Sequence, residues 1–575
     1  MRDNGSSSIN SLQIFVDQYF FFRFICHHRL SAAEISMGSL EAQLLPACSE
    51  GNVEKVEQLI HNNSQDNHQI ISRSFYIACQ QGHSEVVKLL LNDQRIDVEY
   101  MHGATSFYIA CEKGHIEIVK LLLNDQRVNI NQGKEFDVPF YIACENGNIE
   151  IVKLLLNDQR IDINKPLHDT TPFSIACKNG YTDIVELLLN DERIDINGLT
   201  PLWIACMLGR IKDVKLLLND KRDDINQPNK MEETPFYIAC SSGHIEIVKL
   251  LLSDGRVEVG KANNNDTTPF YIACEKGHIE IVKLLLNDER IDINMATKRE
   301  TTPFWIACYN GHIEIVKLLL NDKRVDINQG DQSNQTPFNI VCQEGHIEIV
   351  KLLLSDKRVI DINTPNKYHS TSFYVACENG HIEIVKLLLN DQRVDINKTN
   401  IYGDTPLYAA CQKGRIEIVK LLINERIDIN VANYSGRTPL YVACCFGNIE
   451  IVKLLLSNNA RVVDINEVNN NRQTPLGVAC QYFYIEIVEY ILAYGREVIL
   501  NHQLKVWMAR KKELIEQENL GSEDQNVVNI VKLLESFESN PNETRTKLRI
   551  KFGSTGKIYF YFISIFIFLF SIIIL

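Results

Sequence analysis

The most regular feature of the chain is a block of apolar residues that returns about every 33 residues. In the copy at residues 405–430, Thr405 and Pro406 have the residue types that favour an N-cap and a first helical position. Gly414 follows two turns later and has the residue type that ends a helix in the left-handed conformation. The apolar residues within 416–423 then come at spacings of one, two and three, which predicts a second helix packed on two sides. Each block therefore predicts a helical hairpin, and the turn residues after it predict an extended finger that leads to the next hairpin.

The cysteines follow the same period. Fourteen of the sixteen recur at intervals of 29 to 36 residues, at positions 48, 79, 111, 144, 177, 206, 240, 274, 308, 342, 377, 411, 444 and 480. A helical hairpin of this size cannot bury both of its faces alone, so the copies are expected to stack into a rod in which each contacts its neighbours. Helix axes in such a stack lie about 8 to 10 Å apart, beyond the reach of a disulfide. The cysteines are therefore interpreted as small core residues in a reducing compartment.

These units resemble the ankyrin repeat. They share its period and its TPLxxAAxxGHxxIVxxLL pattern, and most end in Asp-Ile-Asn or Asp-Val-Asn. A Thr-Pro pair begins nine of the units, at Thr171, Thr200, Thr234, Thr268, Thr302, Thr336, Thr405, Thr438 and Thr474. The resemblance covers about residues 40–500. It implies an all-α solenoid of stacked helix-turn-helix repeats with short β-hairpin or turn fingers.

Two departures from that pattern are frequent. The histidine that the family places after Thr-Pro-Leu is replaced by tyrosine or tryptophan, as at Tyr408 and Trp305, so we expect an aromatic ring packed between repeats. The family's Gly-Ala after the second helix is replaced by a longer Asn-Asp-x-Arg segment, as at 124–127, where asparagine can serve as the helix cap. The unit that ends at 197–200 is shortened, and a stunted finger is expected there.

Charge and motifs narrow the chemistry. Lys and Arg number 59 against 73 Asp and Glu, a formal net charge of −14, which argues against nucleic acid as the partner. The recurring histidines, such as His312, lie one repeat apart and cannot share a metal ion. No Cys-x-x-Cys pair and no hydrolase, metalloprotease or kinase motif is present. We therefore expect no catalytic, cofactor or metal site.

The termini differ from the repeats. Residues 1–36 are expected to be a disordered leader before an array at 37–500. Residues 501–540 are predicted to form a C-terminal capping repeat with an insert, and 541–557 form a basic juxtamembrane segment.

The last 18 residues, from Ile558 to Leu575, carry no charge and are long enough to span a thin bilayer as a helix. They are predicted to be one hydrophobic helix, a transmembrane tail anchor, with the repeats on the cytosolic side by the positive-inside rule. The alternative is an apolar tail that does not insert.

Function is expected at the surface of the rod. The resemblance implies that partners bind the concave face, built from finger tips and from the two residues after each Ala-Cys. These pairs vary while the framework does not, and the candidate partner-binding residues are Met207, Leu208, Glu275, Lys276, Tyr309, Gln412, Lys413, Cys445 and Phe446. The apolar members are expected to mark two contact regions, near Leu208 and Phe446, with Tyr309 between them. The alternatives are drift at exposed positions and local packing against neighbouring repeats.

The sequence thus predicts a non-catalytic, monomeric, cytoplasmic scaffold that binds other proteins and is tethered to a membrane by its C-terminus. The alternative is a soluble regulatory or substrate-receptor subunit of an enzyme assembly.

Overall fold

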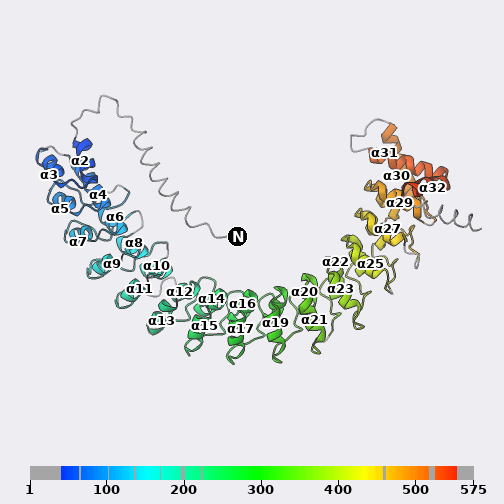
Figure 1. Cartoon of the computed structure of the whole chain (residues 1–575), viewed down its shortest axis with the longest axis horizontal. Coiled ribbons are helices and arrows are strands. Elements are labelled where there is room, and N and C mark those ends of the chain that lie inside the picture. Colours follow the sequence, from blue (N-terminus) through cyan, green and yellow to red (C-terminus); the bar gives the residue numbers. More distant parts are fainter. Residues whose placement is uncertain are drawn as a thin grey trace, which may run out of the picture. The chain divides into compact units, whose positions relative to one another are not determined.

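The computed structural model describes residues 40–552 except 64–66, 101–102, 135–137, 169, 196–200, 221, 223, 360, 426, 458–461, 496 and 517–524. The chain divides into two compact units, Met1–Lys230 and Met231–Leu575. In both units the helices alternate between two rows, so that each helix contacts the next helix of its own row and its hairpin partner in the other row (Figure 1).

In the first unit, the first row consists of α2 (Leu40–Ser49), α4 (His68–Gln81), α6 (Ser106–Lys113), α8 (Pro139–Glu145), α10 (Pro172–Asn179) and α12 (Pro201–Met207). The second row consists of α3 (Val53–His61), α5 (Ser84–Leu91), α7 (Ile116–Leu123), α9 (Ile149–Leu156), α11 (Thr182–Leu189) and α13 (Ile211–Asn219).

In the second unit, the first row consists of α14 (Pro235–Ser242), α16 (Pro269–Lys276), α18 (Pro303–Tyr309), α20 (Pro337–Glu344), α22 (Ser372–Asn379), α24 (Pro406–Gln412), α26 (Pro439–Cys445) and α28 (Pro475–Gln481). The second row consists of α15 (Ile245–Leu252), α17 (Ile279–Leu286), α19 (Ile313–Leu320), α21 (Ile347–Ser355), α23 (Ile382–Leu389), α25 (Ile416–Leu422), α27 (Ile449–Ser457) and α29 (Ile485–Tyr494). Three further helices follow: α30 (His502–Glu516), α31 (Gln525–Ser539) and α32 (Pro541–Lys551).

This arrangement confirms the predicted all-α solenoid of helical hairpins. The prediction of β-hairpin fingers is wrong for the described fingers, which contain turns and no strand. A typical finger is closed by too few backbone hydrogen bonds to form a ladder: Asn263 N donates to Thr267 O at 3.0 Å, and one further bond joins the tip to the previous finger. Within the described residues no helix is long and apolar enough to cross a membrane. The predicted hydrophobic helix at 558–575 lies outside those residues, as does the predicted leader.

The first-row helices begin as their sequences predict. Thr268 lies before α16 in extended conformation, and its hydroxyl accepts a hydrogen bond from Tyr271 N at 3.0 Å. Pro269 takes the first helical position, where its missing N–H costs nothing. In the same helix Phe270, Ala273 and Cys274 are fully buried. The recurring cysteines are buried, which confirms their interpretation as core residues. Burial raises the pKa of the Cys274 thiol well above its ordinary value.

The glycine and histidine between the two helices join neighbouring repeats. Gly277 ends α16 with φ +80°, and a β-carbon there would lie 2.8 Å from the ring of His312 in the next repeat. The small residue therefore leaves room for that ring. His312 Nε2 donates to the carbonyl oxygen of Glu275 at 2.9 Å, a carbonyl at the end of α16. His83, His115, His278, His346 and His381 bond to the preceding repeat in the same way.

The aromatic residues that replace the family's histidine pack between repeats as expected. Tyr374 and Trp305 are buried, and both reach the finger of the following repeat. Asn400 donates to the Tyr374 hydroxyl at 3.0 Å, and Trp305 Nε1 donates to the carbonyl oxygen of Gln335 at 2.7 Å. The aromatic residue thus supplies both buried surface and a hydrogen bond across the joint.

We call the sets of contacts between neighbouring repeats joints. The Asn-Asp-x-Arg segment forms a second joint, which we call the Asp–Arg clamp. In one copy, Arg324 binds the Asp322 carboxylate through Nε and Nη2 and also donates to the carbonyl oxygen of Leu286 at the end of the previous second-row helix. A cation suits this position because the last carbonyls of a helix lack partners and carry partial negative charge. Within the described residues ten clamps are formed, by the pairs 93–95, 125–127, 158–160, 191–193, 220–222, 254–256, 288–290, 322–324, 356–358 and 391–393.

The asparagine that ends each Asp-Ile-Asn segment forms a third joint. Asn294 Nδ2 donates to the carbonyl oxygen of Arg324 at 2.7 Å, and Asn294 Oδ1 accepts from Asp326 N at 2.8 Å. Both partners belong to the next repeat. The same two bonds recur at Asn131, Asn164, Asn363, Asn430 and Asn466.

The C-terminal helices cover the end of the second unit. Helices α31 and α32 both contact α29, the last second-row helix. Residues 541–551, in the predicted basic segment, form α32, and its cations bind the protein itself. Arg549 donates to the carbonyl oxygen of Ala493 at 2.9 Å, and Lys551 pairs with the largely buried Glu489 at 2.5 Å.

The clamps predict an acid-sensitive array. The hydrogen bonds from arginine hold the pKa of each clamp aspartate, such as Asp125, below its usual range. A lowered folded pKa gives stability that is present above about pH 4 and lost as the pH falls through the folded pKa. We therefore expect the melting temperature to drop as the pH is lowered from about 4 to about 2.

The matched variant is Asp125→Asn, which keeps an acceptor oxygen and loses the charge. It should cost about 0.5 to 1 kcal/mol at pH 7 by urea unfolding, because the pair is partly exposed. The difference from the wild-type chain should vanish near the acid end of the titration. An equal difference at both pH values would contradict an electrostatic clamp.

Candidate functional site

The exposed edge of the second-row helices follows one pattern in most repeats. Lysine pairs with a glutamate three residues earlier in nine of these helices, at 117–120, 150–153, 246–249, 280–283, 314–317, 348–351, 383–386, 417–420 and 450–453. Such exposed pairs contribute little stability. A surface that repeats one pattern also presents little with which to distinguish partners, so selectivity belongs elsewhere on the array.

The residues that vary lie at the C-terminal ends of the first-row helices. Several of the charged candidates there bind one another: Lys276 pairs with the adjacent Glu275 at 3.3 Å, and Lys413 pairs with Glu378 of the previous repeat at 3.5 Å. Gln412 is half-buried. These polar candidates are therefore accessible, but their charges are partly compensated within the array.

The first apolar candidates lie in the first unit. Leu208 follows α12 directly and is 41% exposed, while Met207 is half-buried. Ile211, the first residue of α13, is also exposed, so the surface has at least two apolar side chains at this turn. The shortened finger at 197–200 lies outside the described residues.

The remaining apolar candidates lie in the second unit. Tyr309 is exposed and stacks on Trp305, with ring centres 5.5 Å apart and planes inclined by 8°. Phe446 follows α26 and is 53% exposed, and Cys445 beside it is half-buried. Four repeats separate Tyr309 from Phe446, so the structure does not bring them into one cluster.

Phe446 has aromatic neighbours that the sequence interpretation omitted. Tyr482 occupies the corresponding place after α28 and is exposed. Its ring lies 6.3 Å from that of Tyr484, which covers Gly447 of the preceding repeat. The signal was present in the sequence, because Gln481-Tyr482 is the next member of the same variable pair series. The aromatic surface around Phe446 therefore spans two repeats.

A buried polar pair lies in the repeat of Leu208. Asp213 is fully buried on α13 and accepts a hydrogen bond of 2.6 Å from the Thr182 hydroxyl on α11. Its second carboxylate oxygen has no partner among the described residues. Most other second-row helices carry isoleucine at both of these positions, as at Ile116 and Ile118 of α7. The two unusual residues therefore compensate each other across one joint.

This pair predicts coupled stability effects. Thr182→Ile alone removes the one hydrogen bond that the described residues donate to the buried Asp213 carboxylate, and it should cost about 1 to 3 kcal/mol. The double variant Thr182→Ile with Asp213→Ile restores the pattern of the other repeats and should be at least as stable as the wild-type chain. Urea unfolding of both single variants and the double variant measures the coupling. Additive effects would show that the two side chains do not depend on each other.

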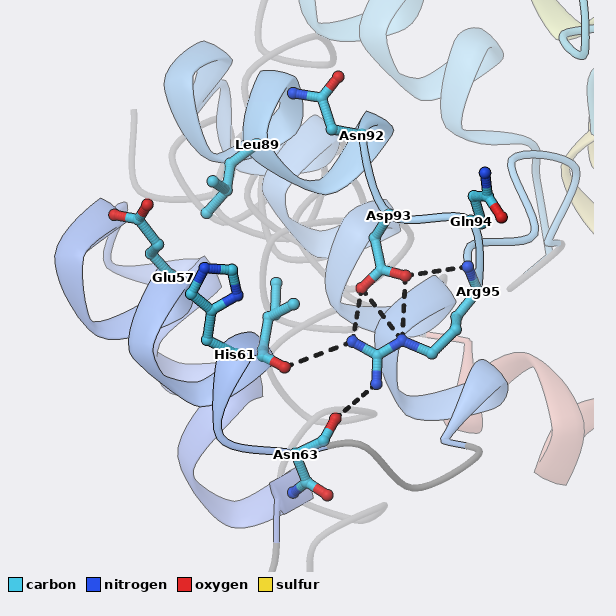
Figure 2. A pocket seen from close by; sticks show the side chains of 9 residues that line it. Glu57, His61, Asn63, Leu89, Asn92, Asp93, Gln94 and Arg95 are labelled. Carbon is cyan, nitrogen blue, oxygen red and sulfur yellow. Dashed lines mark hydrogen bonds and ion pairs between the residues drawn. The ribbon is translucent and has the colours of Figure 1, made fainter.

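A pocket of about 480 Å³ lies between the ends of α3 and α5. Figure 2 shows Arg95 in it, bound to the Asp93 carboxylate and directed toward the backbone of the preceding repeat, where Asn63 O accepts a bond of 2.6 Å. Two of the residues that line this pocket, Asp93 and Arg95, thus make the first Asp–Arg clamp. The residues that the structure describes contain no group of three or more histidine, cysteine, aspartate or glutamate side chains placed to hold a metal ion.

Comparison with protein families gives a match over most of the chain. The family model described as "Ankyrin repeats (3 copies)" matches residues 44–133, 140–229, 221–297, 289–366, 358–433 and 427–502. These segments cover most of the chain and the paired helix rows described above. A search of curated proteins finds no match.

Proposed function

We propose, from the premise that the chain belongs to the ankyrin-repeat family, that it is a non-catalytic scaffold that binds other proteins along its first-row helix ends and fingers. The observation that carries this proposal is the exposure of large apolar side chains at variable positions on a constant framework. Leu208 and Phe446 stand where other repeats have polar residues such as Lys276. Interfaces concentrate their energy in such residues surrounded by polar ones.

The array has the properties that this role requires. The helix caps and the joints between repeats fix the backbone conformation. The residues that form them recur from repeat to repeat. The residues after each Ala-Cys make few of those contacts, so they can change without loss of the fold. A rigid framework with replaceable contact residues lowers the entropic cost of binding, because little has to be ordered when a partner docks.

Two substitutions test the contact regions. Once proximity labelling has identified a partner, Leu208→Ser and Phe446→Ser should each weaken its affinity for the full chain at least about tenfold, the cost of losing a central apolar contact. The melting temperature should stay unchanged, because both side chains are largely outside the core. Ile499→Ser, which removes an equally exposed apolar residue elsewhere, serves as the control. Retained affinity with a lowered melting temperature would assign Leu208 and Phe446 to packing instead.

We further propose that residues 558–575 tether the scaffold to a membrane, with the repeats on the cytosolic side. The support is the uncharged 18-residue sequence and the cations that precede it. The second candidate function is a soluble regulatory or substrate-receptor subunit of an enzyme assembly, in which this tail does not insert. Extraction of cell membranes with alkaline carbonate distinguishes the two, because an inserted protein stays in the pellet.

Arginine substitutions in the tail sharpen this test. Replacing Ile567 and Phe568 with arginine should oppose insertion by about 5 to 7 kcal/mol. The variant should then move from the carbonate-resistant pellet to the supernatant, while the matched leucine variant stays in the pellet. If the arginine variant and the wild-type chain divide identically between the fractions, the tether is absent.

A further inference from the structure

The tips of the fingers in the second unit form one continuous row. Each tip accepts or donates one backbone hydrogen bond to its neighbour, and two of these bonds are Ile401 N to Tyr368 O at 2.9 Å and Tyr434 N to Tyr402 O at 3.0 Å. The same bond joins the earlier tips, from Met231 onward, and continues to Asn470. Neighbouring tips are therefore held side by side in a fixed order, and residues on them form a surface rather than separate loops.

Three consecutive tips expose a tyrosine. Tyr368, Tyr402 and Tyr434, which we call the tyrosine tips, are 51%, 61% and 74% exposed. The backbone bonds place Tyr402 next to both of the others. Gly403 has φ +77°, and a β-carbon there would lie 2.8 Å from the Tyr434 ring, so this glycine lets the ring lie against the neighbouring tip. The result is a short row of aromatic side chains open to solvent.

The fold itself does not need these rings. In the same repeats the tyrosines that seal the joints, Tyr374, Tyr408 and Tyr441, are buried at the starts of first-row helices. The tyrosine tips lie beyond those joints and contribute little to the core. Exposed tyrosines of this kind suit binding, because each supplies a large rigid surface and a hydroxyl at a small entropic cost.

The charge around the tyrosine tips is positive, in contrast to the chain as a whole. Lys367, Arg437 and Arg472 are exposed on this part of the row and have no carboxylate partner among the described residues. The Asp404 carboxylate nearby is buried and accepts hydrogen bonds from Asn433 and from Asn400, so it presents little charge to solvent. The one exposed acid in these four tips is Glu467.

The earlier tips of the same unit are different. Between residues 231 and 336 they carry Glu232, Glu233, Asp266, Glu300 and Asp331 against three basic residues, and they have no tyrosine. The row thus changes from an acidic, non-aromatic part to a basic, aromatic part over consecutive repeats. The asparagine joint recurs in both parts, so it does not dictate the difference between them.

We infer that the tyrosine tips, with Lys367, Arg437 and Arg472, dock an extended acidic segment of a partner protein that carries apolar side chains between its carboxylates. Cations that lack a carboxylate partner within the array would attract the carboxylates, and the rings would cover the apolar side chains. This inference rests on the proposed function, because it takes the array to bind proteins. The acidic segment would bind at a surface separate from the helix ends at Leu208 and Phe446.

The experiment uses the full chain and a fluorescent peptide. The probe repeats Glu-Glu-Pro-Leu to about twelve residues, long enough to span the tips in extended form. Control peptides of equal length carry Lys-Lys-Pro-Leu or Ser-Ser-Pro-Leu repeats. Fluorescence anisotropy should show that only the acidic peptide binds and that added salt lowers its affinity. Tyr402→Ala with Tyr434→Ala, and separately Lys367→Glu with Arg437→Glu, should each reduce the affinity at least about tenfold.

Matched variants separate this surface from general effects. Lys323→Glu with Lys357→Glu makes the same charge change at exposed positions after two second-row helices and should leave the affinity unchanged. Tyr402→Phe with Tyr434→Phe should retain most of the binding, because the rings remain. Circular dichroism melting checks that the alanine variant stays folded.

Three results would overturn the inference. They are equal binding of the acidic and serine peptides, unchanged affinity in the folded tyrosine variant, and stronger binding of an oligothymidylate of similar length, which would assign the surface to nucleic acid. None of them depends on Leu208 or Phe446. Any of these results therefore leaves the proposed scaffold function intact. That function is tested separately, by the partner affinity of Leu208→Ser and Phe446→Ser.

Discussion

The joint between neighbouring repeats is the interaction on which the rest of this structure depends. A hairpin of two short helices has two apolar faces and too few residues to bury them, so no repeat is stable without its neighbours. The joint supplies buried surface through residues such as Phe270 and Cys274. It also satisfies backbone groups that helix ends leave unpaired: histidine serves the first-row helices, and the clamp arginine serves the second-row helices.

The residues proposed to bind partners are different from those that form these joints. The residues that make them are nearly the same in each repeat and point between repeats. Among the side chains that differ, the apolar ones at the helix ends, such as Leu208 and Phe446, and the tyrosines of the finger tips are exposed to solvent. Asp213 and Thr182 are two unusual residues within one joint. The unusual residue of one repeat is matched by the unusual residue of the next, to which it is hydrogen-bonded. At the finger tips, by contrast, an acidic part and a tyrosine-rich part occur on the same backbone.

Much of the fold could be predicted because its signals are local and repeated. The Thr-Pro start, the glycine end and the apolar spacing each act within one hairpin, and the observed helices begin and end where these residues stand. The candidate contact residues were also found from the sequence, as variable pairs in a constant frame, although Tyr482 was missed. The β-hairpin fingers were predicted wrongly, because the few backbone hydrogen bonds within each finger and the one to the next tip are too few to form paired strands.

The sequence by itself determined the helical hairpin, its period and the burial of alanine and cysteine, because caps and apolar spacing act between residues a few positions apart. Only the tertiary structure decided the roles of the clamp arginines and of the asparagines that end the Asp-Ile-Asn segments, whose partners lie about one repeat away in the chain. It also decided which tyrosines are buried. Tyr402 and Tyr408 are the same residue type six positions apart, yet one is open to solvent and the other is enclosed. The difference arises because a neighbouring repeat covers the start of the helix and leaves the tip of the finger uncovered.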